Sequence, residues 1–167
     1  MKTASRLYGD TTYVRQITIS ALVIAMYLTV MYVTQGVAFG QYQVRIATAL
    51  YALSAIFPFL VLPMGLANLL SNVLMGGLGL PDMIGGAVAG LTTAGLVYFI
   101  RERGLSDWWI AVPIILCPGL MVPIWLSPIL GVPYTALAVS LTIGQVIPGI
   151  VGVLLVKQLK NKIRWIS

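Results

Sequence analysis

The sequence contains no histidine, a single cysteine and only four acidic residues among 167. Without histidine, the chain lacks both the commonest general base and the commonest metal ligand. Cys117 lies inside an apolar segment, so it has no intrachain disulfide partner and forms no metal-ligand pattern. The acids are Asp10, Asp82, Glu102 and Asp107, and the last two share one short basic loop. This inventory argues against an enzyme, and we expect no cofactor.

Charge is also scarce: charged residues make up 8% of the chain and hydrophobic residues 59%, with a mean hydropathy of +0.98. These apolar segments exceed what a soluble core of this size could bury, although a very hydrophobic soluble helical protein is the alternative. We therefore predict one membrane domain over residues 1–167. The net charge of +6 comes from basic residues at the ends of apolar segments, where cytoplasmic flanks carry them. Membrane topology explains this charge better than a nucleic-acid partner does.

The hydropathy pattern predicts an all-α membrane protein with six transmembrane helices, at approximately residues 16–36, 45–58, 61–76, 83–101, 108–127 and 133–157. A cleaved signal peptide is an alternative for the first run, but the run is longer than the usual apolar core of about 7–15 residues and no good A-x-A site follows it. Pro58 and Pro63 favour a break between the second and third runs. With two crossings there, every Lys and Arg except Arg45 lies on one side, which the positive-inside rule makes the cytoplasm. Both termini are then cytoplasmic.

Small residues at four-residue spacing predict close helix packing, among them Gly86, Gly90 and Ala94 on the fourth helix. Ala21 and Ala25 form such a pair on the first helix, and we predict that they dock a partner. A longer stripe of small residues runs along the sixth helix, at Ala136, Ser140, Gly144, Pro148 and Gly152. The spacing alone leaves open whether the stripe packs against a helix of this chain or of a partner.

Polar residues gather at the outer face that this topology predicts. Arg45 lies in the first outer loop, and Asp82 closes the second. Polar groups inside a membrane are costly, so such residues are candidates for function, and their convergence suits a small polar solute. The candidate substrate-binding residues are Gln41, Gln43, Arg45, Thr48, Asn68, Asn72, Asp82, Trp125, Tyr134 and Gln145. The alternative interpretation is structural, with Arg45 and Asp82 forming an interfacial ion pair while the asparagines join helices.

The first loop resembles the signature of the QueT family, G-x-x-Q-x-R-I-x-x-A-L, at Gly40, Gln43, Arg45, Ile46, Ala49 and Leu50. Further similarities are Ala67-Asn68-Leu69, GLGLPD ending at Asp82, and Gly86 with the small residues after it. The similarity is good over roughly residues 16–100 and otherwise lies in hydropathy. Members of this family are substrate-binding S-components of energy-coupling factor (ECF) transporters and are thought to carry queuosine precursors such as deazaguanine bases.

The resemblance implies six helices, cytoplasmic termini and a substrate site near the outer face. It also implies docking, through Ala21 and Ala25, onto a membrane-embedded T-component driven by two ATPase subunits. One position departs from the family pattern, which has an acid three residues after the arginine, where this chain has Thr48. A carboxylate accepts hydrogen bonds more strongly than a hydroxyl. The substrate therefore differs from the family's usual one, or Asp82 supplies the charge.

Our sequence-based hypothesis is a multi-pass protein of a prokaryotic plasma membrane that captures a small polar micronutrient for an ECF importer. In this hypothesis Arg45 binds an electronegative group of the ligand. The other polar residues form hydrogen bonds with the polar edge of the ligand, and Trp125 or Tyr134 stacks on its planar ring. The chain has no GxxxxGK[ST] motif, so ATP hydrolysis falls to partners. The alternatives are a standalone small-solute transporter, against which the small size and the lack of an evident inverted repeat argue, and a membrane assembly subunit.

Overall fold

A computed structural model describes residues 2–39, 42–76 and 78–166, with side chains described between residues 12 and 162. All the regular elements in these ranges are helical. In chain order they are α1 (Lys2–Val33), α2 (Gln35–Ala38), the 3-10 helices η1 (Ile46–Ala55) and η2 (Pro58–Leu60), α3 (Val61–Ser71), the π-helical turn η3 (Asn72–Gly76), α4 (Leu80–Glu102), the 3-10 turn η4 (Asp107–Ile110), α5 (Ala111–Leu130), α6 (Tyr134–Gly144) and α7 (Val146–Ile166).

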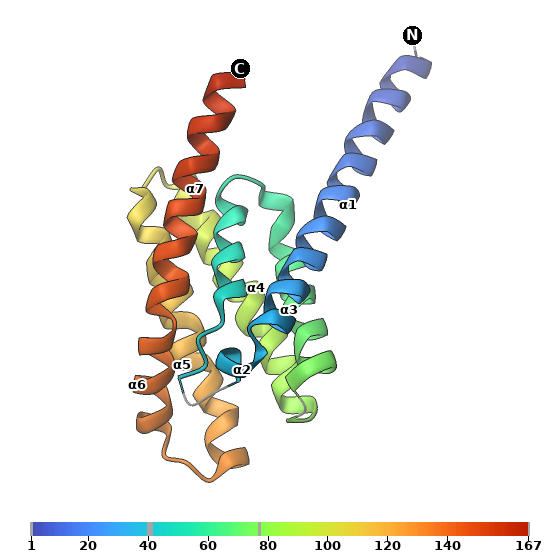
Figure 1. Ribbon diagram of the computed structural model, residues 1–167. Helices are drawn as coiled ribbons and strands as arrows, with labels where there is room; N and C mark the ends of the chain where they lie inside the picture. The colour runs from blue at the N-terminus through green and yellow to red at the C-terminus, as the bar shows by residue number, and fades with distance from the viewer. Residues whose placement is uncertain (1, 40–41, 77, 167) are drawn as a thin grey trace.

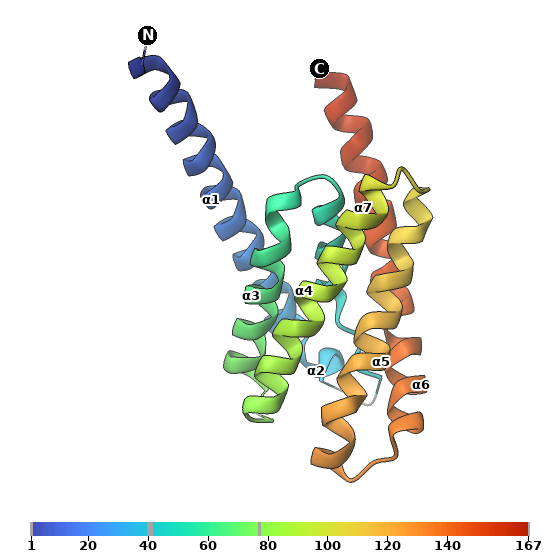
Figure 2. The ribbon, with the colours of Figure 1, turned by 180° about the vertical axis from the view of Figure 1, so that it is seen from behind.

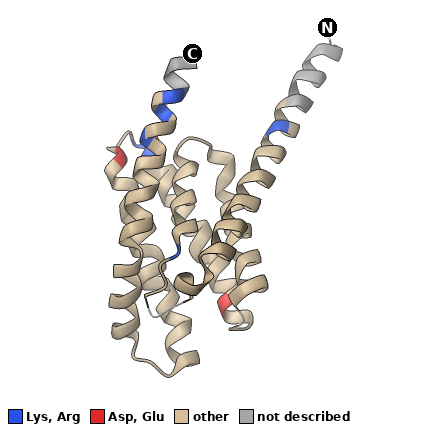
Figure 3. Ribbon diagram, in the orientation of Figure 1, with Lys and Arg blue, Asp and Glu red and all other residues tan. Residues whose placement is uncertain are grey.

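Five stretches of the described chain are long and apolar enough to cross a membrane. They are Thr12–Val33, Pro58–Gly76, Leu80–Glu102, Asp107–Leu130 and Tyr134–Lys162. α1 begins and α7 ends at the same end of the molecule, and Figures 1 and 2 show the other long helices arranged beside them as a bundle. Lys and Arg cluster at that end (Figure 3). The chain is thus an apolar helical bundle with its basic residues concentrated at one end.

The second predicted helix, at residues 45–58, is a different kind of element from the other five. η1 is a 3-10 helix of ten residues, too short to count among the candidate spans. A 3-10 helix rises about 2.0 Å per residue against about 1.5 Å in an α-helix, so ten residues extend about 20 Å instead of 15 Å. Residues 47–55 are all buried, and η1 contacts α1, α3, α4, α5 and α7. The stretched form lets a short segment run back through the bundle interior, as Figure 1 shows.

The small-residue stripe of the last crossing packs against η1. Gly144, Pro148 and Gly152 are buried. A Cβ at Gly152 would lie 3.1 Å from both the Ala49 carbonyl oxygen and the Ala52 Cβ. The partner of the buried part of the stripe is therefore internal. The crossing itself is two helices, α6 and α7, which meet at Gln145.

Candidate polar binding site

Arg45 is the charged centre of a buried polar cluster. It immediately precedes η1, and its side chain is only 5% exposed. Its Nη1 donates to Asn72 Oδ1 at 3.2 Å and to Asn68 Oδ1 at 3.5 Å, and the guanidinium carbon lies 4.9 Å from the centroid of the Phe39 ring. Arg45 Nε is buried and has no hydrogen-bond partner among the described residues. The cation is thus held by neutral oxygens and an aromatic face, and its buried Nε–H stays unused.

Two asparagines one helical turn apart present their oxygens to Arg45 from the same side. Asn68 lies on α3, and Asn72 begins the π-helical turn η3. A π-turn inside a helix often marks a functional position. Asn72 also donates through Nδ2 to the Asp82 carbonyl oxygen at 2.9 Å. A Cβ at Gly86 would overlap this Asn72 amide, so only glycine lets α4 approach so closely.

Asp82 does not occupy a loop but the first turn of α4, where a carboxylate is favoured by the helix dipole. It is 2% exposed, and its Oδ1 accepts from Trp125 Nε1 at 3.1 Å. The other oxygen, Oδ2, is buried and finds no partner within the part of the chain that the structure describes. Arg45 and Asp82 form no ion pair in these ranges. The ion pair of the structural interpretation is therefore wrong, whereas its asparagines do join segments, because the Asn72 side chain bridges Arg45 and the Asp82 backbone.

A second chain of bonds links the first loop to the junction of α6 and α7. The Thr48 hydroxyl lies 2.7 Å from both the Arg45 carbonyl oxygen and Gln145 Oε1, and its one proton serves either acceptor. Gln145 Nε2 donates to the Gln43 carbonyl oxygen at 3.1 Å. A Cβ at Gly144 would overlap the Tyr42 carbonyl oxygen. The loop before Arg45 is therefore fastened by its backbone to the last crossing.

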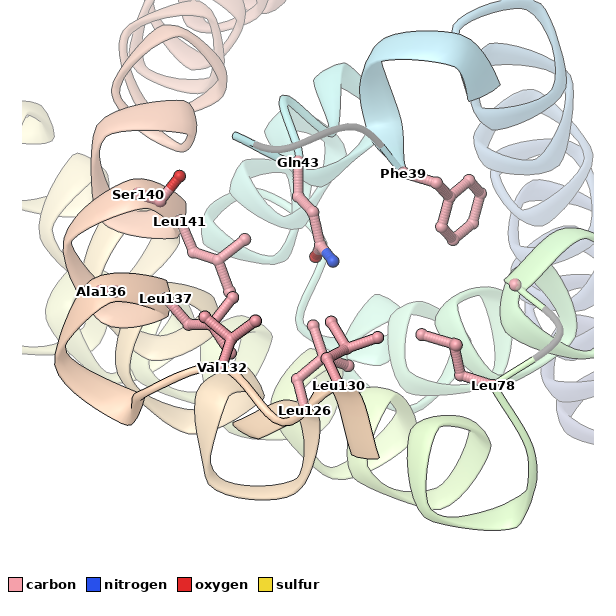
Figure 4. Close-up of a pocket in the computed structure, with 11 residues that line it drawn as sticks. Phe39, Gln43, Leu78, Leu126, Leu130, Val132, Ala136, Leu137, Ser140 and Leu141 are labelled. Carbon is pink, nitrogen blue, oxygen red and sulfur yellow. The ribbon is translucent and has the colours of Figure 1, made fainter. Parts of the chain in front are cut away.

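An open cavity of about 490 Å³ lies beside this cluster. Figure 4 shows the Gln43 side chain pointing into it, opposite Leu126, Leu130 and Leu141. Gln43 also lines a void of about 10 Å³ against Arg45, Thr48, Asn68 and Gln145, about the size of one water. Gln43 has a φ of 41°, which is uncommon for a residue other than glycine. It thus separates a largely apolar open cavity from the polar cluster.

Most of the candidate residues predicted from the sequence meet in this cluster. They are Gln43, Arg45, Thr48, Asn68, Asn72, Asp82 and Gln145, with Trp125 joined through Asp82. Tyr134 lies apart, because it is 41% exposed and its hydroxyl donates to the Leu120 carbonyl oxygen at 2.9 Å. Trp125 packs against Gly85 and donates its Nε1–H to Asp82 Oδ1. Gln41 lies outside the described residues. Ala21 and Ala25 are exposed on α1, away from the cluster.

Sequence reasoning missed two members of the site's surroundings, Tyr27 and Tyr51. Both are fully buried, and the Tyr51 hydroxyl accepts from Asn68 Nδ2 at 2.6 Å. The sequence does contain a signal for them, because each tyrosine lies in the middle of an apolar segment, whereas membrane tyrosines usually lie at the interface. Among the described residues, His, Cys, Asp and Glu nowhere gather in threes as a metal site requires. The cluster holds instead hydrogen-bond donors and acceptors that include one cation, Arg45, and one carboxylate, Asp82.

Comparison with known proteins agrees with the resemblance in the first loop. The family model described as QueT transporter matches residues 17–161. No curated protein and no solved structure matches the chain. The family match extends well past residue 100, through α5 and α6 and into α7, where the sequence resemblance lay in hydropathy. Because it covers most of the chain, this multi-pass membrane protein belongs to the QueT transporter family.

Proposed function

We propose that this transporter is the substrate-binding S-component of an ECF importer of a prokaryotic plasma membrane. It captures a small polar micronutrient, a queuosine precursor or a related deazaguanine, nucleobase or vitamin, from the outer side. The observation that carries the proposal is the pair of unused polar atoms, Arg45 Nε and Asp82 Oδ2, buried on the two sides of Asn72. A buried charge without a full set of partners is costly. A ligand with an acceptor and a donor group would complete both.

The ligand enters through the outer cavity and displaces the Gln43 side chain to reach Arg45. A cavity of about 490 Å³ is within the range of small-molecule sites, and its leucines suit the body of a flat ring. Thr48, which stands where the family has an acid, has its hydroxyl engaged by Arg45 and Gln145. Asp82, with one free oxygen, is therefore the carboxylate that we assign to the ligand's N–H groups.

The topology that we propose has six crossings, with η1 as the internal one and both termini in the cytoplasm. The concentration of Lys and Arg at the end where α7 ends supports this orientation. A T-component docks on α1 through Ala21 and Ala25, whose exposure leaves their backbone open to another helix. An apolar groove of about 480 Å³ between α1 and α3 includes Ala21 and Ile24 and supports the same surface.

Ligand binding by the purified chain tests the proposal. Titration with deazaguanine bases, nucleobases and common vitamins should find at least one that binds below about 10 μM, as a scavenging receptor requires. Failure of every compound would contradict the proposed ligand class.

Co-purification with its partners tests the transport mechanism. We expect a T-component and two ATPase subunits to accompany the tagged chain from its native membrane. Solute uptake by liposomes that contain this chain alone would instead support a standalone transporter.

A further inference from the structure

Two buried tyrosines join α1 to the polar cluster. Tyr27 on α1 and Tyr51 on η1 are each 0% exposed. Their rings stack with centroids 5.9 Å apart, and their hydroxyl oxygens lie 3.2 Å apart. Two hydroxyls in an apolar interior must find partners, since an unmade buried hydrogen bond is costly.

Hydrogen bonds connect these hydroxyls to Asn68 on α3. Asn68 Nδ2 donates to Tyr51 Oη at 2.6 Å, and the Ser71 hydroxyl donates to the Asn68 carbonyl oxygen at 2.9 Å. The Tyr27 hydroxyl bonds to Tyr51. If Tyr51 accepts from Asn68, its own proton goes to Tyr27.

Arg45 and Tyr51 together decide how the Asn68 amide is held. The guanidinium can only donate, so it requires the amide oxygen, and the amide nitrogen then donates to Tyr51. The reversed amide would put an N–H₂ group against the guanidinium, donor against donor. The tyrosines come from α1 and η1, whereas Asn68 lies on α3.

We propose that Tyr51, held in turn by Tyr27, is a positioning residue that keeps Asn68 Oδ1 directed at Arg45. The position of α1 thereby affects the geometry of the binding site, although no described residue of α1 lines the cavity. The effect on ligand binding rests on the proposed function. The orientation of the amide does not.

Side-chain amide NMR tests the orientation without any ligand. The chain has three asparagines, Asn68, Asn72 and Asn161, so selective ¹⁵N labelling gives three amide pairs that single substitutions assign. In Tyr51→Phe, the Asn68 pair should shift and exchange with water about tenfold faster, because its acceptor is gone. Tyr27→Phe should cause a smaller shift of the same pair. Tyr32→Phe, which removes a 64% exposed hydroxyl from the same helix, should change nothing. Unchanged Asn68 signals in Tyr51→Phe overturn the proposal.

Binding of 7-deazaguanine separates positioning from a general loss of packing. Tyr51→Phe should weaken binding about fivefold in the natural background but less than about twofold in Asn68→Asp, because a carboxylate presents an oxygen to Arg45 in either orientation. An equal loss in both backgrounds overturns the positioning role. If the natural protein binds no 7-deazaguanine, the proposed ligand class fails, and the amide signals still decide the orientation.

Discussion

Two regions of the molecule each hold a basic and an acidic side chain, and only one of the two regions joins them in an ion pair. At the end where α7 finishes, Lys160 and Asp107 form an ion pair whose side chains are 25% and 21% exposed. Inside the bundle, Arg45 and Asp82 are 5% and 2% exposed, yet they do not pair. Asn72 bridges Arg45 to the Asp82 backbone, and Arg45 Nε and Asp82 Oδ2 are buried without a partner among the described residues. The pair that water can reach is thus joined directly, whereas the two buried charges are not.

This contrast separates a structural role from a binding role. A partly exposed ion pair contributes little to stability, typically below about 1 kcal/mol. Keeping two charges buried without their opposite partners costs more, and a structural role would pair them or replace them with apolar residues. Under the proposed function, the interior charges are held for a ligand, whereas the exposed ones serve orientation in the membrane.

The largest expected effect is on ligand binding by Arg45→Ala. Loss of charge-assisted hydrogen bonds inside the cluster should weaken binding about 100-fold, or about 2.7 kcal/mol. Isothermal titration of the detergent-purified protein measures this affinity. Lys160→Ala is the matched control and should leave it unchanged. Equal losses in the two variants would show that the interior charge has no special role.

Gly86→Ala should act next most strongly, because the added methyl group would displace the Asn72 amide from Arg45 and Asp82. Overpacking of this kind costs about 1–3 kcal/mol. We expect a lower melting temperature and about tenfold weaker binding.

Gly95→Ala on the same helix is the control for that substitution, since a Cβ there meets nothing within 4 Å. It should retain the natural affinity and melting temperature. A Gly86→Ala protein that behaves like Gly95→Ala would contradict the close contact between α4 and Asn72.

Of these three substitutions, Asp82→Asn should have the smallest effect on binding. Unlike Gly86→Ala, it should make the empty protein more stable. Removing a buried charge with a free oxygen should raise the melting temperature of the empty protein while lowering ligand affinity about fivefold. Thermal unfolding with and without ligand measures both. Asp107→Asn should change neither by much, because Asp107 is already paired and partly exposed. A loss of stability in empty Asp82→Asn would contradict the account of Asp82 as an unsatisfied charge.

Much of the site could be predicted from the sequence, because a polar residue stands out in an apolar run. Arg45, Asn68, Asn72, Asp82 and Gln145 were all predicted in this way, and they all lie in the buried cluster. The prediction missed Tyr27 and Tyr51, whose rings resemble ordinary apolar core until the partners of their hydroxyls are known. It included Tyr134, which lies apart, because a tyrosine beside an outer loop suits either a belt or a pocket.

Composition and the order of residues were enough to establish a helical membrane protein with basic residues at one end. Transfer into lipid and attraction of charge to one side depend on each segment almost independently of the others. The pairing of atoms depends on segments that meet only after folding, as Thr48 meets Gln145 and Arg45 meets Asn72. The tertiary structure alone decided that residues 46–55 form an internal 3-10 helix and that Asn72 comes between Arg45 and Asp82. Those outcomes follow from the space and the hydrogen-bond partners that neighbouring helices leave, which no single segment encodes.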